Sequence, residues 1–140
     1  MSAILCRVWW QPWNAGSEWR RFRKPEHALV GVGYLCNRVK RSLVVRHAGN
    51  WIWAGTGVQN GTHLRSLVAI EADGLSSSSP RNIDVIGSSP ITCRGRVVHA
   101  SVTYYSAKSG AGVFAAGTIH WTCALMAVRC SNLSNIPVVR

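Results

Sequence analysis

The chain has 140 residues, of which 47% are apolar, and a formal net charge of +11 from 16 Lys and Arg against 5 Asp and Glu. This length suits one domain with a hydrophobic core, and the apolar fraction excludes an intrinsically disordered chain. The N-terminus has too short an apolar run for a signal peptide, and no window reaches the roughly 18 apolar residues of a membrane helix, so a cytoplasmic protein without a membrane span is expected.

Residues 1–27 read as an irregular lead-in, rich in tryptophan and basic residues, with no sustained helix or strand period. Between residues 19 and 24, cations are interleaved with aromatic rings, a pattern typical of surfaces that bind nucleic acid or an anionic membrane. The candidate binding residues are Trp19, Arg20, Arg21, Arg23 and Lys24. Because the net charge reflects scarce acids rather than abundant bases, such binding is the alternative function and is not the favoured one.

From residue 28 onward, short apolar runs replace the irregular pattern. They predict strands at residues 28–35, 42–46, 67–72, 83–86 and 97–105, with a further short apolar segment at 51–54. Residues 74–80 are the clearest loop, residues 109–112 a tight turn, and residues 118–128 a helix. The pattern therefore indicates a strand-rich α/β domain with one or two helices, followed by a tail at residues 131–140.

The five cysteines are widely spaced and include no Cys-x-x-Cys pair; they are Cys6, Cys36, Cys93, Cys123 and Cys130. An odd count without a secretory signal argues against a disulfide framework, and a structural zinc site needs closely paired ligands. Most of these side chains are therefore predicted to be buried thiols.

Four blocks of sequence together carry a family resemblance: residues 50–57 (Asn-Trp-Ile-Trp-Ala-Gly-Thr-Gly), 70–73 (Ile-Glu-Ala-Asp), 109–114 and 116–121. In this order and spacing they resemble the C-terminal domain of the large (beta) subunit of the bacterial N,N-dimethylformamidase-like family. The resemblance implies that residues 28–130 are part of a glutamine-amidotransferase-like α/β domain. It also implies kinship with a metal-dependent amidohydrolase that cleaves an amide C–N bond and holds iron through a tyrosine and two glutamates.

Glu71 is the candidate metal ligand, because it lies in the block where the family carries an acid, at the end of an apolar run. The structural alternative is a surface or salt-bridged acid beside Asp73. The other glutamates, Glu18 and Glu26, lie in the lead-in, outside any block that resembles a ligand motif. Because Tyr104 and Tyr105 are better explained as strand residues, with one ring pointing inward, an iron site cannot readily be completed from this chain.

Two other residue types could carry chemistry. The histidines His47, His63, His99 and His120 do not have the spacing of a ligand pair on a helix, and His120 is expected to be a half-buried imidazole with its hydrogen bonds satisfied. Cys123 would need a neighbouring base to act as a nucleophile, and none is evident. No catalytic residue is therefore assigned from the sequence.

The chain departs from the family pattern after Trp121, where it reads Thr-Cys-Ala-Leu-Met, and at Arg21, where relatives carry an acid. These departures predict a truncated or diverged relative that is not active alone. Its expected partners are the missing upstream part of the domain or a second copy of itself.

Overall fold

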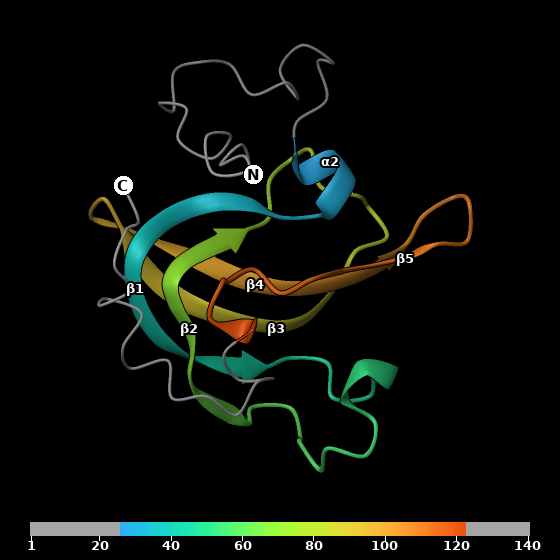
Figure 1. Cartoon of the computed structure of the whole chain (residues 1–140), viewed down its shortest axis with the longest axis horizontal. Helices are drawn as coiled ribbons and strands as arrows, with labels where there is room; N and C mark the ends of the chain where they lie inside the picture. Colours follow the sequence, from blue (N-terminus) through green and yellow to red (C-terminus); the bar gives the residue numbers. More distant parts are fainter. Residues whose placement is uncertain (1–25, 123–140) are drawn as a thin grey trace, which may run out of the picture.

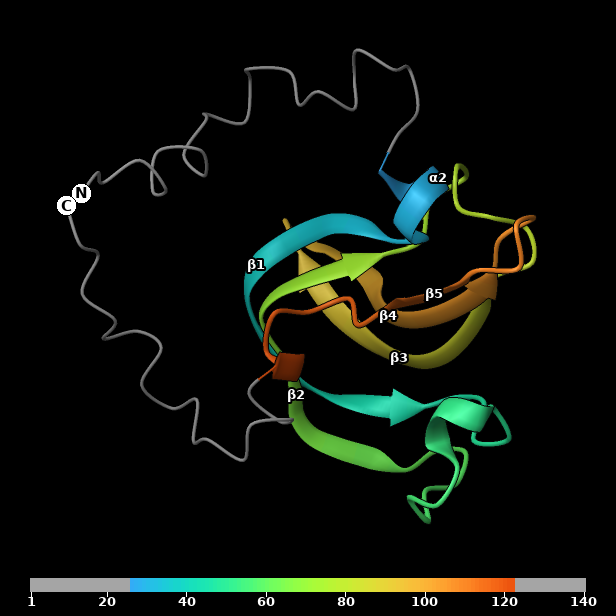
Figure 2. The same ribbon diagram turned by 45° about the vertical axis from the view of Figure 1, so that its right-hand side comes forward.

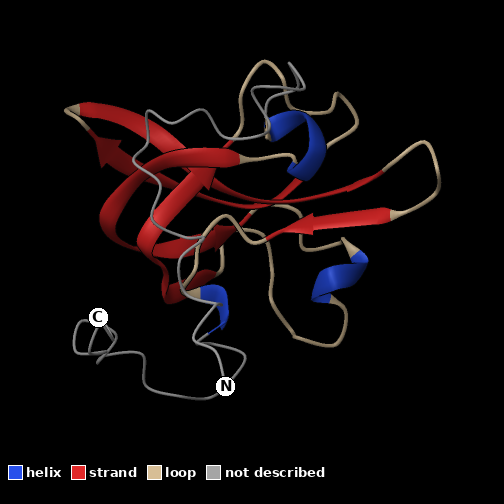
Figure 3. Cartoon of the chain, turned by 45° about the horizontal axis from the view of Figure 1, so that its top comes forward, coloured by secondary structure: helices blue, strands red, loops and turns tan. Residues whose placement is uncertain are grey.

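The computed structural model describes residues 26–122 of the chain. Strands outweigh helices in this range, as Figure 3 shows. The elements, in chain order, are α2 (His27–Val30), β1 (Gly33–Val45), the 3-10 turn η1 (Trp51–Trp53), β2 (His63–Gly74), β3 (Asp84–Cys93), β4 (Arg96–Ser106) and β5 (Gly112–Ala115).

The five strands form one antiparallel sheet in the order β2-β1-β3-β4-β5. The β1–β2 and β3–β4 ladders are long, whereas β1 and β3 pair only through Val44 with Ser88 and Val45 with Gly87. Register shifts interrupt the β1–β2 ladder at three places, and each such irregularity bends the strand and increases its twist. The sheet consequently curls into a half-barrel (Figures 1 and 2).

The segment after β5 ties the far side of the curled sheet back to β2. The backbone N–H of Asp73 donates to the carbonyl of Gly117 over 2.9 Å. Thr118 Oγ1 donates to the carbonyl of Ala69 over 2.9 Å and accepts from the N–H of the same residue over 3.2 Å. These bonds satisfy backbone groups of β2 that an open sheet edge would leave unpaired.

The hydrophobic core draws on both long ladders, so it fixes their relative position. Its largest fully buried apolar side chains are Leu43, Ile86, Val45, Val68 and Val102. η1 adds Trp53, which is 7% exposed and donates its indole N–H to the carbonyl of Ile86 over 3.2 Å. Trp53 is therefore an anchor of the core, with its one polar atom satisfied.

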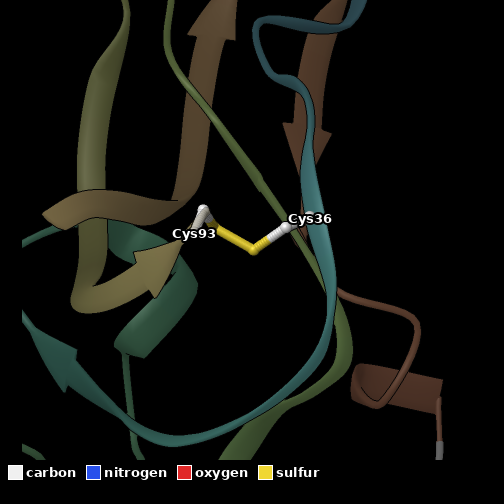
Figure 4. Close-up of a disulfide and its surroundings, with 2 residues drawn as sticks. All are labelled: Cys36 and Cys93. Atoms are coloured by element: carbon white, nitrogen blue, oxygen red, sulfur yellow. A yellow bond between two sulfur atoms is a disulfide. The ribbon is translucent and has the colours of Figure 1, made fainter. Parts of the chain in front are cut away.

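A disulfide joins Cys36 of β1 to Cys93 of β3, with Cα atoms 5.9 Å apart (Figure 4). The prediction of buried thiols is therefore wrong for these two residues. Their separation of 57 residues has no local signature, because they meet only when β1 and β3 come together in the sheet. The other three cysteines, Cys6, Cys123 and Cys130, lie outside the described residues.

The expectation of a strand-rich domain is confirmed, and the run at 97–105 lies within β4. The predicted strand at 28–35 is wrong in its first half, where α2 forms and ends at Gly31, whose φ of 91° suits a glycine cap. The segment at 51–54 contains η1 rather than extended chain. All ladders in residues 26–122 are antiparallel, so the glutamine-amidotransferase-like relation remains a prediction.

Three predicted segments, the lead-in, the C-terminal helix and the tail, lie largely outside the described residues. The lead-in ends at residue 27 and the tail begins at residue 131, and most of both lies outside the described residues. The predicted helix at 118–128 has only its first five residues within them. Among residues 26–122, no helix is long and apolar enough to cross a membrane.

Candidate functional site

Glu71, the predicted metal ligand, lies in β2 opposite Asn37 of β1. Hydrogen bonds hold β2 on both sides of Glu71: the backbone of Ala69 is bonded to the hydroxyl of Thr118, and the N–H of Asp73 donates to the carbonyl of Gly117. The blocks 70–73 and 116–121, which lie far apart in the sequence, therefore meet at Glu71. Residues of these blocks therefore hold the stretch of β2 that carries Glu71.

The backbone next to Glu71 is strained. Ile70 has a φ of 72°, and Arg38, on the neighbouring strand, has a φ of 58°. The left-handed region costs a non-glycine residue about 1–3 kcal/mol, and it is a genuine outlier for a β-branched side chain. Both residues belong to the stretch where the β1–β2 register shifts between Asn37 and Val39. Strain of this kind clusters at functional sites, so it marks this stretch of the sheet.

The carboxyl groups around Glu71 influence one another. Burial raises the pKa of Glu71, and the charges of Asp73 and then Glu26 raise it further. Burial also raises the pKa of Asp73, as does Glu26, while His27 acts in the opposite direction. No Lys or Arg in the described part of the chain forms a salt bridge with these acids. Within residues 26–122, these carboxylates therefore lie near one another without a salt bridge to a Lys or Arg side chain.

We predict that Glu71→Gln raises the melting temperature by a few degrees at neutral pH. A pKa raised in the folded state means that the folded chain binds protons more tightly than the unfolded chain. The free energy of unfolding therefore falls as the pH rises from about 4 through the raised pKa values of Glu71 and Asp73. The amide removes the contribution of Glu71, so the variant should gain most above this range and nothing below it.

Thermal melts between acidic and neutral pH measure this effect, with Asp84→Asn as the matched control. Asp84 accepts hydrogen bonds from His47 and Asn50, so its amide variant should lose stability at neutral pH rather than gain it. A Glu71→Gln variant that is less stable than the parent chain at neutral pH would contradict the prediction.

The described residues do not complete the iron site that the family resemblance implies. Within residues 26–122, no group of three His, Cys, Asp or Glu side chains could hold a metal ion. Tyr34 lies opposite Asp73 in the β1–β2 ladder, close to the carboxylates along the strands. Tyr104 and Tyr105 lie in β4, and the buried ring of Tyr105 confirms that one of the two points inward. No reaction step through a metal follows from this arrangement.

A second polar arrangement, which sequence reasoning missed, lies between η1 and the start of β3. Asp84 Oδ2 accepts from His47 Nδ1 over 2.7 Å and from Asn50 Nδ2 over 2.8 Å. Asn50 in turn accepts from the N–H of Ile52 and so caps η1. A histidine that donates Nδ1–H to a carboxylate presents its other nitrogen as a base or ligand. The His47 side chain is 56% exposed, so the ring as a whole is open to solvent.

Aromatic rings border this arrangement. Trp51, 66% exposed, makes an edge-to-face contact with Tyr104 at a centroid distance of 5.5 Å. Tyr104 pairs with Asp84 across the β3–β4 ladder, so the exposed ring lies near the polar group. No single signal in the sequence could have found this arrangement, because His47 and Asp84 are 37 residues apart.

The remaining sequence-based candidates are not brought together in the described structure. His63 and His99 lie on β2 and β4. His120 is half-buried as expected, but its Nδ1 atom is buried without a hydrogen-bond partner among the described residues, so the expectation of a satisfied ring is wrong. The candidate nucleic-acid-binding residues 19–24, together with Glu18 and Cys123, lie outside the described residues.

Comparison with known families assigns the chain. No curated protein and no solved structure matches it. The sequence model of the family described as "N,N-dimethylformamidase beta subunit-like, C-terminal" matches residues 9–135, which is nearly the whole chain and includes every block that meets at Glu71. The chain therefore belongs to the N,N-dimethylformamidase beta subunit-like, C-terminal family.

Proposed function

We propose that the chain supplies the sheet that carries Glu71 to an amidohydrolase of this family, and that another polypeptide region supplies the rest of the site. The observation that carries the proposal is the convergence of the family blocks 70–73 and 116–121 on Glu71, within a family match over residues 9–135. The family description itself names a C-terminal part of a beta subunit. Activity would then belong to the assembly and not to this chain alone.

Glu71 has the properties that this role requires. It is a half-buried oxygen donor on a strand that is fixed on both sides of it, and a carboxylate suits a hard cation such as iron. The repulsion that it experiences from Asp73 and Glu26 is of the kind that a bound cation relieves. Glu71 would be one metal ligand among several, and a partner region would have to supply the others. This agrees with the absence of a complete set of metal ligands in residues 26–122.

The test is co-expression of the chain with the polypeptide encoded beside it, followed by iron analysis and an assay of dimethylamine release from N,N-dimethylformamide. The complex is expected to hold iron and hydrolyse the amide, and Glu71→Gln is expected to abolish both properties. Asp84→Asn is the matched control, because it also removes one carboxylate but lies in β3, and it should retain both properties.

Two outcomes would overturn the proposal. Iron and turnover that survive Glu71→Gln in the complex would exclude Glu71 as a ligand. Turnover by the purified chain in the absence of any partner would exclude the need for a second polypeptide region.

A further inference from the structure

The sheet divides where β1 and β3 separate. β1 and β3 pair at Val44 with Ser88 and at Val45 with Gly87, and they separate on the side that precedes Val44 in β1 and follows Ser88 in β3. Next to these pairs, the hydroxyl of Ser89 donates to the carbonyl of Ser42 over 2.6 Å. The disulfide between Cys36 and Cys93 joins the strands again at the other end (Figure 4). The interval between these two ties is a gap in the β1–β3 ladder.

A pocket of about 100 Å³ occupies this interval, and its wall is strongly basic. The residues that line it are Arg38, Val39, Lys40, Arg41, Ile91 and Thr92. The three cations are exposed and lie within four consecutive positions of β1, whereas Ile91 of β3, which also lines the pocket, is 2% exposed. The pocket thus combines clustered positive charge with the hydroxyl of Thr92.

The cations of the pocket have no anionic partner in the described part of the chain. None of them forms a salt bridge there, and the one hydrogen bond found for their head groups is from Arg41 to the backbone carbonyl of Lys40. The carboxylate nearest in strand register, that of Glu71 opposite Asn37, does not line the pocket. Adjacent like charges repel one another, so an anion that neutralises them binds favourably.

The backbone of the pocket is also unusual. Arg38 has a φ of 58°, a conformation that a long side chain adopts only when its surroundings impose it. It lies at a register shift of the β1–β2 ladder, and irregularities of this kind re-aim side chains next to binding sites. A rigid guanidinium presents paired donors that match the oxygens of phosphate.

We propose that the pocket between β1 and β3 binds a single phosphate-class oxyanion, either free or as the terminal group of a small phosphate monoester, and that the Cys36–Cys93 disulfide holds its two walls in place. Cys36 lies two residues before Arg38, and Cys93 directly follows Thr92, so the bond joins both walls. Reduction of the disulfide frees the walls and weakens binding. The proposal does not depend on the proposed amidohydrolase role.

The test is calorimetric titration of the full chain with inorganic phosphate and, separately, with phenyl phosphate; the two arms distinguish the free ion from the ester. Arg38→Gln and Arg41→Gln are each expected to weaken binding roughly tenfold, because each removes a charge-assisted hydrogen bond. Lys108→Gln is the matched control, since it removes one exposed cation from the β4–β5 turn, and it should leave the affinity unchanged.

Reduction with dithiothreitol should weaken binding several-fold in the parent chain, with circular dichroism reporting whether the fold persists. If the reduced chain unfolds, the exposed-residue variants Arg38→Gln and Arg41→Gln decide the question alone. An equal loss of affinity in Lys108→Gln, or no loss in the pocket variants, would show general attraction to a basic protein and overturn the proposal. Binding of a single-stranded oligonucleotide without binding of either small phosphate would overturn it as well.

Discussion

Removing the Cys36–Cys93 disulfide is expected to lower the free energy of unfolding by about 4 kcal/mol, from the entropy of closing a loop of this length. The bond spans 57 residues and joins the two strands of the sheet that share only two residue pairs. Since the weakest ladder of the sheet carries the covalent link, the reduced chain should first lose the contact between β1 and β3. Chemical denaturation of Cys36→Ala/Cys93→Ala, compared with the parent chain, measures the effect.

The same bond can be tested without mutation. Proteolysis of the unreduced protein should give one peptide pair that contains both Cys36 and Cys93, and dithiothreitol should separate the pair. Alkylation of all five cysteines in the folded protein without a reductant would contradict the structure. Disulfides persist in oxidising compartments, so the outcome also bears on the expected cytoplasmic location, which remains a prediction.

The sequence predicted those elements whose signals are local. The β-branched and aromatic run at 97–105 gives β4, and the run at 67–72 lies within β2. The strand predicted at 28–35 is wrong in its first half because its apolar residues suit a strand, whereas the chain forms a short helix that ends at Gly31. Gly31 itself is the kind of residue that caps a helix, so this signal was present in the sequence. Local patterns therefore predicted parts of β1 to β4, but neither β5 nor the helical turn between residues 27 and 31.

The candidate site was likewise predicted only in part from the sequence. Glu71 was identified from a resemblance, and the structure adds what holds its strand, namely the bonds of Ala69 and Asp73 to a segment almost 50 residues further along the chain. The hydrogen bond of His47 with Asp84 and the Cys36–Cys93 bond depend on strand pairing over long sequence distances. No composition or spacing rule encodes such pairs, because the topology of the sheet creates them.

Gly117→Ala is expected to destabilise the chain by about 2–4 kcal/mol, a larger effect than a typical surface substitution. Gly117 has a φ of 63°, and a Cβ atom at this position would collide with the backbone carbonyl of Ser101. A carbonyl in the middle of β4 cannot move without disturbing its ladder with β3. The alanine should therefore displace residues 117 and 118 from β2 and break their bonds to Asp73 and Ala69.

Gly110→Ala separates the two causes of this loss. Gly110 also has a left-handed backbone, with a φ of 86°, but a Cβ atom there would meet nothing within 4 Å. Its alanine variant should cost only about 1 kcal/mol, the backbone term alone. The difference between the two variants then measures the close approach of the segment after β5 to β4 and β2. Equal losses in denaturant melts would mean that this segment does not close the half-barrel, and the strand that carries Glu71 would lose the support on which its proposed role depends.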